Sequence, residues 1–206
     1  MAINFTTLTG AKSTESSIKY WVNHGLVPSA DILTEAQAWI YERLRVREMI
    51  ATATVTAAIG ASTFTLPTRF LEPIRLLPDG WGESLPFVHE NLHQRYRDED
   101  GNLEEGDPSE WTIADEVGVF DSELTTAFSG RMTFYQTPAA LVVTTNETNF
   151  LTTRFPTMLR YACMAFGYDA RKRRADATEM KVLAMAEIEE ANRESDRGRR
   201  GQVRMR

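Results

Sequence analysis

The chain has 206 residues, of which 42% are hydrophobic and 25% are charged, and its formal net charge is −6. This balance is typical of a globular protein, and a chain of this length buries enough apolar surface to fold without disulfides or a structural metal. The sequence holds one cysteine, no apolar stretch long enough to cross a bilayer and no signal-peptide pattern, so neither a membrane-spanning nor a disulfide-stapled protein is expected.

Charge is distributed unevenly along the chain. Residues 193–206 hold six Arg and two acidic residues, or +4, which leaves −10 for the rest. Residues 98–110 hold seven acidic residues and no basic one. Blocks of like charge are usually solvated. The Arg-rich end also lacks a core-forming run, so we expect it to be flexible when alone.

Two helices are predicted near the N-terminus. The first is predicted at residues 13–24, where Ser13 or Thr14 can cap the start of the helix and Gly25 follows its end. Residues 27–49 form the second prediction, with apolar side chains at helical spacing: Leu33, Ala36, Ile40 and Leu44. These residues predict one buried face on the second helix.

The middle of the chain changes to the alternating pattern of strands. Residues 52–66 predict a β-hairpin, and residues 71–79 predict a strand that is edge-like or bulged because Pro73 interrupts it. Further short strands are predicted at 85–88, 110–116, 117–122 and 130–137. Turn residues rather than helical crossovers separate these strands, which indicates antiparallel pairing.

Helix returns after Asn149, with Pro156 in a first-turn position. The predicted apolar stripe is Phe155, Leu159, Ala162, Phe166 and Ala170, with Cys163 beside it as a core residue rather than a nucleophile. A second stripe follows a charged break: Met180, Leu183 or Ala184, Ile188 and Ala191. Both stripes are interpreted as core faces.

The layout predicts an α+β fold in which N- and C-terminal helices pack together as a bundle, with an antiparallel β lobe inserted between them in the sequence. The expected boundaries are 1–51 with 149–192 for the bundle, 52–148 for the lobe and 193–206 for a flexible basic tail.

One pentapeptide matches a catalytic motif. HENLH, with His89, Glu90 and His93, fits the H-E-x-x-H signature, in which two histidines one helical turn apart bind zinc and the glutamate acts as general base. Pro86 leaves little room for a helix before His89, and a charged, Gly-broken segment follows. We therefore expect a solvated helical turn here, and a zinc hydrolase remains the least favoured alternative. No other catalytic or cofactor motif is present, so we expect no enzyme and no cofactor.

Several segments together resemble a known family. They are a helix ending in Leu44–Arg45, the stretch LPTRFLEPIRL at 66–76, a loop with Gly106, Pro108, Trp111 and Ile113, the pair Phe134–Tyr135, and TNFLTTRFP with Asn149, Leu151 and Pro156, followed by Tyr161. In this order and spacing, over about residues 30–190, the chain resembles the head-to-tail adaptor (connector, or head-completion) proteins of bacteriophages.

The resemblance implies a structural role. Such adaptors form a ring, typically a dodecamer, under the portal in the neck of the virion. They extend the channel through which packaged DNA passes without specific binding, and they receive a downstream tail or nozzle protein. Assembly in the host cytoplasm follows from this role, and no membrane partner is expected.

The Arg-rich end is the candidate partner-binding site, because it can order in a cleft of the portal and pair with carboxylates there. The expected binding residues are Arg193, Arg197, Arg199, Arg200, Val203, Arg204, Met205 and Arg206. The main alternative is a nucleic-acid-binding protein that uses the same arginines on phosphates.

Overall fold

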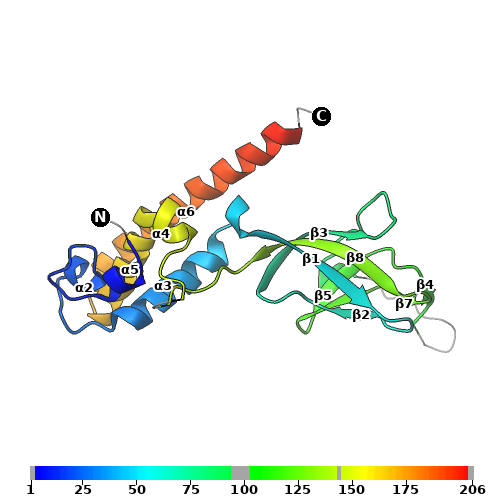
Figure 1. The fold of residues 1–206 in the computed structure, drawn as a ribbon, viewed down its shortest axis with the longest axis horizontal. Coiled ribbons are helices and arrows are strands. Elements are labelled where there is room, and N and C mark those ends of the chain that lie inside the picture. The colour runs from blue at the N-terminus through cyan, green and yellow to red at the C-terminus, as the bar shows by residue number, and fades with distance from the viewer. Residues whose placement is uncertain (1–2, 94–102, 143–144, 204–206) are drawn as a thin grey trace. The chain divides into compact units, whose positions relative to one another are not determined.

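The structure is a computed structural model that describes residues 3–93, 103–142 and 145–203, with the backbone alone from 198 onward (Figure 1). The chain forms two compact units. Met1–Glu48 and Pro138–Arg206 make the helical unit, and Met49–Thr137 make the β lobe. Helices and largely antiparallel sheets confirm the predicted α+β class.

The helical unit begins with three helices: α1 (Phe5–Thr9), α2 (Ile18–Trp21) and α3 (Ser29–Arg43). Helix α1 was not predicted. Its start is marked by a capping box, in which the Asn4 side chain accepts from the Thr7 N–H and the Thr7 side chain accepts from the Asn4 N–H. The predicted helix 13–24 is too long, because Ser17 is the residue that caps α2, through a bond from the Tyr20 N–H.

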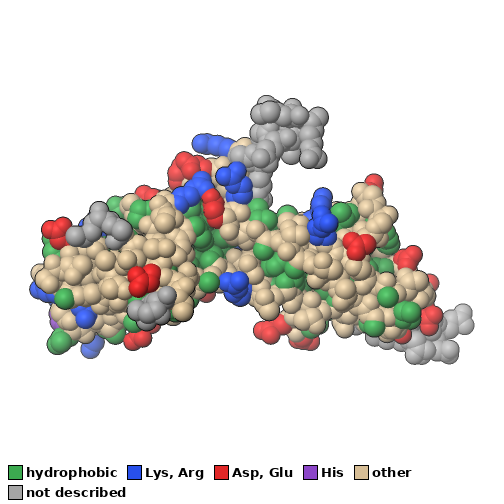
Figure 2. Space-filling model, viewed as in Figure 1, with side chains coloured by type: hydrophobic (Ala, Val, Ile, Leu, Met, Phe, Trp, Pro, Cys, Tyr) green, Lys and Arg blue, Asp and Glu red, His purple; other side chains and the backbone are tan. Residues whose placement is uncertain are grey.

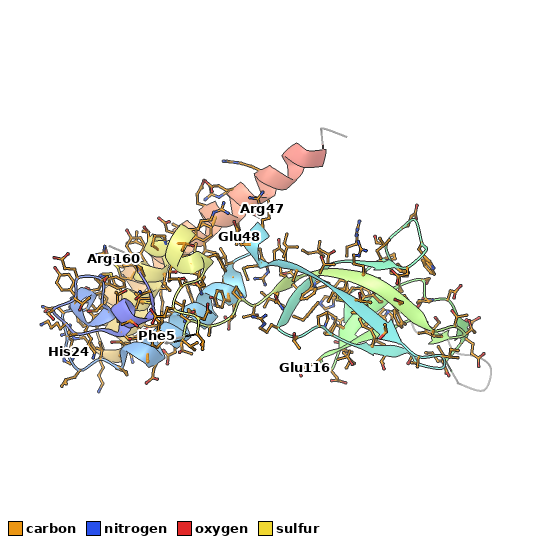
Figure 3. The ribbon with its side chains drawn as sticks, in the orientation of Figure 1. Phe5, His24, Arg47, Glu48, Glu116 and Arg160 are labelled. Atoms are coloured by element: carbon orange, nitrogen blue, oxygen red, sulfur yellow. The ribbon has the colours of Figure 1, made fainter. Side chains whose placement is uncertain are left out.

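The predicted second helix is correct in type but also too long, since α3 ends at Arg43 and Leu44 is extended. All four predicted apolar residues of this stretch are buried: Leu33, Ala36, Ile40 and Leu44. A short 3₁₀ helix, η1 (Arg47–Met49), follows. Glu48 of η1, which is labelled in Figure 3, forms an ion pair with Arg154 of α4.

Three helices complete this unit: α4 (Phe150–Arg154), α5 (Pro156–Ala170) and α6 (Arg174–Val203). Asn149 caps α4 with a second capping box, and Pro156 occupies the first turn of α5 as predicted. α5 packs against both α3 and α6. The buried face of α5 includes Met158, Leu159, Ala162, Cys163 and Ala165. Of the predicted stripe, Leu159 and Ala162 are therefore buried, whereas Phe155 and Phe166 are half-buried and Ala170 is exposed.

α6 packs mainly through alanines: Ala177, Ala184 and Ala191 are buried together with Ile188, whereas Met180 is half-buried and Leu183 is exposed. The sequence predicted a flexible tail from residue 193, but α6 continues to Val203. Arg, Glu and Gln are good helix formers, and an ion pair between Arg193 and Glu190 supports the turn, so the helix tolerates its two glycines.

The β lobe contains one sheet in the order β1 (Ile50–Ala57), β8 (Phe128–Gln136) and β3 (Phe70–Pro78). β3 lies at an edge, and its register with β8 shifts at Phe70/Glu72 and Pro73/Arg75, which confirms the prediction from Pro73. The predicted hairpin 52–66 is wrong. β1 pairs with β8, whereas β2 (Thr63–Thr65) pairs with β6 in another sheet.

The second sheet has the order β2, β6 (Val117–Phe120) and β5 (Trp111–Ala114). Asp115 and Glu116 connect β5 to β6 with positive φ values of 48° and 65°, as a type I′ hairpin turn requires, and Glu116 stands at its tip in Figure 3. A parallel pair joins β4 (Glu105–Gly106) to β7 (Glu123–Leu124). The predicted strand 85–88 is reduced to single bridges at Leu85 and Phe87.

An aromatic cluster forms the core of the lobe. The rings of Phe64 and Trp111 lie 5.7 Å apart, and those of Phe64 and Phe120 lie 4.9 Å apart. Gly118 is opposite Phe64 in the β2–β6 pair, where an added Cβ would lie 2.1 Å from the phenyl ring. The aromatic ring therefore occupies the space that a side chain at 118 would need.

Candidate interaction surfaces

The candidate partner-binding arginines lie at the end of α6. Arg193 and Arg197 are exposed, and the Arg193 guanidinium lies 3.2 Å from the carboxylate of Glu190. Arg199, Arg200 and Val203 belong to the helix by their backbone, and Arg204, Met205 and Arg206 are outside the described residues. Ala191 is the last buried residue of α6 in the described part, so a helical arm of about 18 Å follows it, at 1.5 Å per residue.

Asn192 fastens this arm to the end of α3. Its Nδ2 donates to the carbonyl oxygen of Arg43 at 3.0 Å, and its Oδ1 accepts from the backbone N–H of Arg45 at 2.7 Å. The last carbonyls of a helix have no partner within the helix, so this amide supplies a cap from a distant segment. The role of Asn192 was not predicted from the sequence, where an asparagine within a run of good helix formers is only a weak signal of it.

A buried polar cluster joins α3 to the segment before α4. Gln37 Oε1 accepts from the Leu141 N–H at 3.1 Å, and the Tyr41 hydroxyl accepts from Asn149 Nδ2 at 2.9 Å. Burial raises the pKa of Tyr41 well above its ordinary value of 10.0, while the bond from Asn149 lowers it to a smaller extent. Asn149, one of the residues on which the family resemblance rests, therefore has a structural role here.

The H-E-x-x-H segment does not have the geometry of a zinc site. His89 precedes a single 3₁₀ turn, η2 (Glu90–Leu92), and His93 follows it, so the two imidazoles are not on consecutive turns of an α-helix. His93 is turned into the lobe, with Nδ1 3.1 Å from the carboxylate of Glu110. Within the described residues no three His, Cys, Asp or Glu side chains gather as a metal site would require.

Other residues considered as reactive or ligand-binding are parts of the core. Cys163 is fully buried, and burial raises the pKa of its thiol, so the nucleophilic thiolate is disfavoured. Trp111 is also fully buried, whereas Trp81 is 43% exposed. None of the helices in the described ranges is long and apolar enough to cross a bilayer.

Charge is segregated between the two units. The helical unit carries 18 basic and 14 acidic side chains, or +4, and the β lobe carries 5 basic and 15 acidic side chains, or −10. Acidic side chains are spread over the visible face of the lobe in Figure 2. The acidic run predicted at 98–110 belongs to this lobe, and residues 98–102 of it are outside the described residues.

One known protein family matches the chain. The chain matches the SU10 adaptor protein family over residues 14–206, which is nearly its whole length. The chain belongs to this family. Membership confirms the resemblance to phage head-to-tail adaptors, and it supports a structural role in a phage. No curated protein matches the chain.

Most of the residues that carry the resemblance have structural roles in this fold. Leu44 and Arg45 form the junction between α3 and α6, Pro73 shapes an edge strand, Trp111 fills the lobe core and Asn149 begins α4. The arginines at the end of α6 remain the candidates for contact with a partner.

Proposed function

We propose that this protein is a head-to-tail adaptor whose copies close into a ring, a dodecamer, under the portal in the neck of the virion. The ring extends the channel for packaged DNA and receives a downstream tail or nozzle protein, and it assembles in the host cytoplasm without a cofactor or catalysis. The observation that carries the proposal is the family match over residues 14–206.

The end of α6 supports a role in portal binding. It extends beyond the last buried residue, Ala191, with the exposed Arg193 and Arg197 on it. Guanidinium groups pair with carboxylates through two parallel hydrogen bonds, so an acidic cleft on the portal is a matching partner. One such arm binds weakly, but a ring presents many arms at once and gains avidity.

The acidic β lobe supports the channel function. With −10 over 89 residues, the lobe repels phosphate groups and does not favour adhesion of DNA to the ring. A ring also needs two unlike faces on each copy, which meet in a heterologous contact.

Truncation before Arg193 tests the arm. This cut removes all six arginines and retains Asn192, so the hydrogen bonds to Arg43 and Arg45 are kept. We expect at least a tenfold loss of co-sedimentation with portal particles and an unchanged circular dichroism melting curve for the remaining chain. A matched variant with Arg193 and Arg197 changed to Gln shows how much of the loss is due to charge. Undiminished binding by the truncated chain rules out the arm as the main anchor.

Binding of the arm to nucleic acid is the alternative use of the same arginines. The structure offers it little support, because Glu190, Glu194 and Asp196 alternate with Arg193 and Arg197 along the helix. DNA binding that weakens steeply with salt, without affinity for the portal, supports this alternative instead.

A further inference from the structure

The β lobe contains a cavity of about 200 Å³. Its lining includes Leu124 of β7 and Asp107, which follows β4; both strands are labelled in Figure 1. Apolar side chains form part of its wall: Pro78, Pro108, Leu124 and Phe128. Trp81, which is 43% exposed, adds an aromatic ring. The remaining lining includes two carboxylates, Asp79 and Asp107, and no Lys, Arg or His.

The two carboxylates come from different segments. Asp79 follows β3, in a turn where Gly80 has a φ of +79° and the Trp81 N–H donates to the Pro78 carbonyl oxygen. Asp107 follows β4. The turn after β3 therefore contributes Asp79 and Trp81 to the lining of the cavity, and the segment after β4 contributes Asp107.

Asp79 is held in place before any ligand arrives. Its backbone N–H donates to the carbonyl oxygen of Ser129 at 2.9 Å, and its Oδ2 accepts from the Ser129 hydroxyl at 2.5 Å. The Asp79 Oδ1 and both oxygens of Asp107 have no ion-pair partner within the part of the chain that the structure describes. These oxygens are available as acceptors for a cationic donor.

We propose that this cavity binds the cationic side chain of an arginine or lysine from a partner protein. The carboxylates of Asp79 and Asp107 accept hydrogen bonds from the charged group, and the ring of Trp81 stabilises the cation through its π face. The apolar wall contacts the methylene groups that carry the charge, as long cationic side chains commonly require.

Size and charge select this ligand over others. Cavities for drug-sized molecules occupy roughly 300–1,000 Å³, so about 200 Å³ suits a single side chain better than a cofactor. Two carboxylates and an aromatic ring disfavour phosphate and nucleic acid, which are anionic. Two carboxylates alone are also fewer than the six or more oxygen ligands that calcium takes.

This site rests on the proposed function for the identity of its partner, which is a protein that docks to the adaptor with a basic segment. Docking of such a segment is expected to be steered by the net charge of −10 on the lobe and fixed by insertion of one side chain into the cavity. The arm of α6 and this cavity then serve two different partners.

Titration of the intact chain with short peptides tests the site without portal or tail proteins, so its result is independent of the proposed function. The probes are acetyl-Gly-Arg-Gly-amide, its Lys analogue and its Gln analogue, followed through the indole N–H signals of the ¹⁵N-labelled protein. The Trp81 signal is assigned with Trp81→Phe. We expect the Arg and Lys peptides to shift it in a saturable way, the Gln peptide to leave it in place, and the buried Trp111 not to respond.

Asp107→Asn is the decisive variant, because Asp107 does not share the hydrogen bonds that hold the turn at Asp79. Its peptide affinity is expected to fall about two- to fivefold, the range found for solvent-exposed ion pairs, because Asp107 is exposed. Glu116→Gln removes one acidic side chain of the same lobe at the β5–β6 hairpin and is the matched control, with unchanged affinity expected. Equal shifts from the Arg and Gln peptides, equal weakening by both variants, or displacement of the peptide by millimolar Ca²⁺ overturns the proposal.

Discussion

Replacement of Asn192 tests the junction between α3 and α6. Asn192→Ala removes a donor to the Arg43 carbonyl and an acceptor for the Arg45 N–H. A typical hydrogen bond contributes about 1 kcal/mol, and the bond to Arg45 is partly buried whereas that to Arg43 is exposed. We therefore expect a loss of about 2 kcal/mol in the free energy of unfolding of the helical unit.

Asn192→Asp separates the two contributions. The carboxylate still accepts from the Arg45 N–H, but it no longer donates to the Arg43 oxygen and places a negative charge at the C-terminal end of α3, where the helix dipole disfavours it. We expect a loss of about 1–2 kcal/mol for this variant, with the Arg45 bond intact.

Amide hydrogen exchange measured by NMR reports on the hydrogen bond from the Arg45 N–H to Asn192. Denaturant unfolding followed by circular dichroism gives the free energy of unfolding. The Arg45 amide is expected to be protected in the wild type and in Asn192→Asp, and to exchange faster in Asn192→Ala. A difference of about 0.3 kcal/mol is within the variation among independent surface substitutions. If both variants unfold within that difference of the wild type and Arg45 exchange does not change, the Asn192 side chain does not stabilise this junction.

Three further outcomes are expected. Gly118→Ala forces the ring of Phe64 to move and costs about 1–3 kcal/mol, which thermal unfolding of the lobe measures, and a wild-type melting curve contradicts it. Stability falls as pH rises above about 10, because the raised pKa of Tyr41 keeps the hydroxyl neutral in the folded state while the unfolded chain ionises. Tyr41→Phe, which loses the bond from Asn149, is expected to show a shallower decline on denaturant titration. Cys163 is expected to resist a thiol-specific reagent at pH 8 until denaturant is added, and rapid labelling of folded protein contradicts its burial.

The sequence predicts the helices best where the apolar period is long and the start is chemically marked. Pro156 and the capping asparagine Asn149 locate the beginning of the C-terminal helices, and Leu33 to Ile40 give the correct face of α3. Helix ends are predicted less well, because Leu44 continues the apolar spacing although its backbone is already extended. The side chain that bonds to the end of α3 belongs to Asn192, some 150 positions away, and a local pattern does not contain such a contact.

In the lobe, alternation predicts strands but not their partners. β1 and β2 both alternate, and a glycine-containing segment between them is typical of a hairpin, yet the chain crosses from one sheet to the other so that Phe64 joins the aromatic core. The arginines at the end of α6 are found from composition alone. The cavity at Trp81 is not, because Asp79, Asp107 and Phe128 come together only through tertiary structure.

The amide of Asn192 also determines where a pulling force on the end of α6 enters the fold. Tension on the arm travels along the helix to the two hydrogen bonds with α3 and then to the small apolar contacts of Ala191, Ile188 and Ala184. A force directed along the helix axis loads those contacts in shear, so several must slip together before the helix detaches. The mechanical strength of any attachment made through this end is therefore that of the junction between α3 and α6.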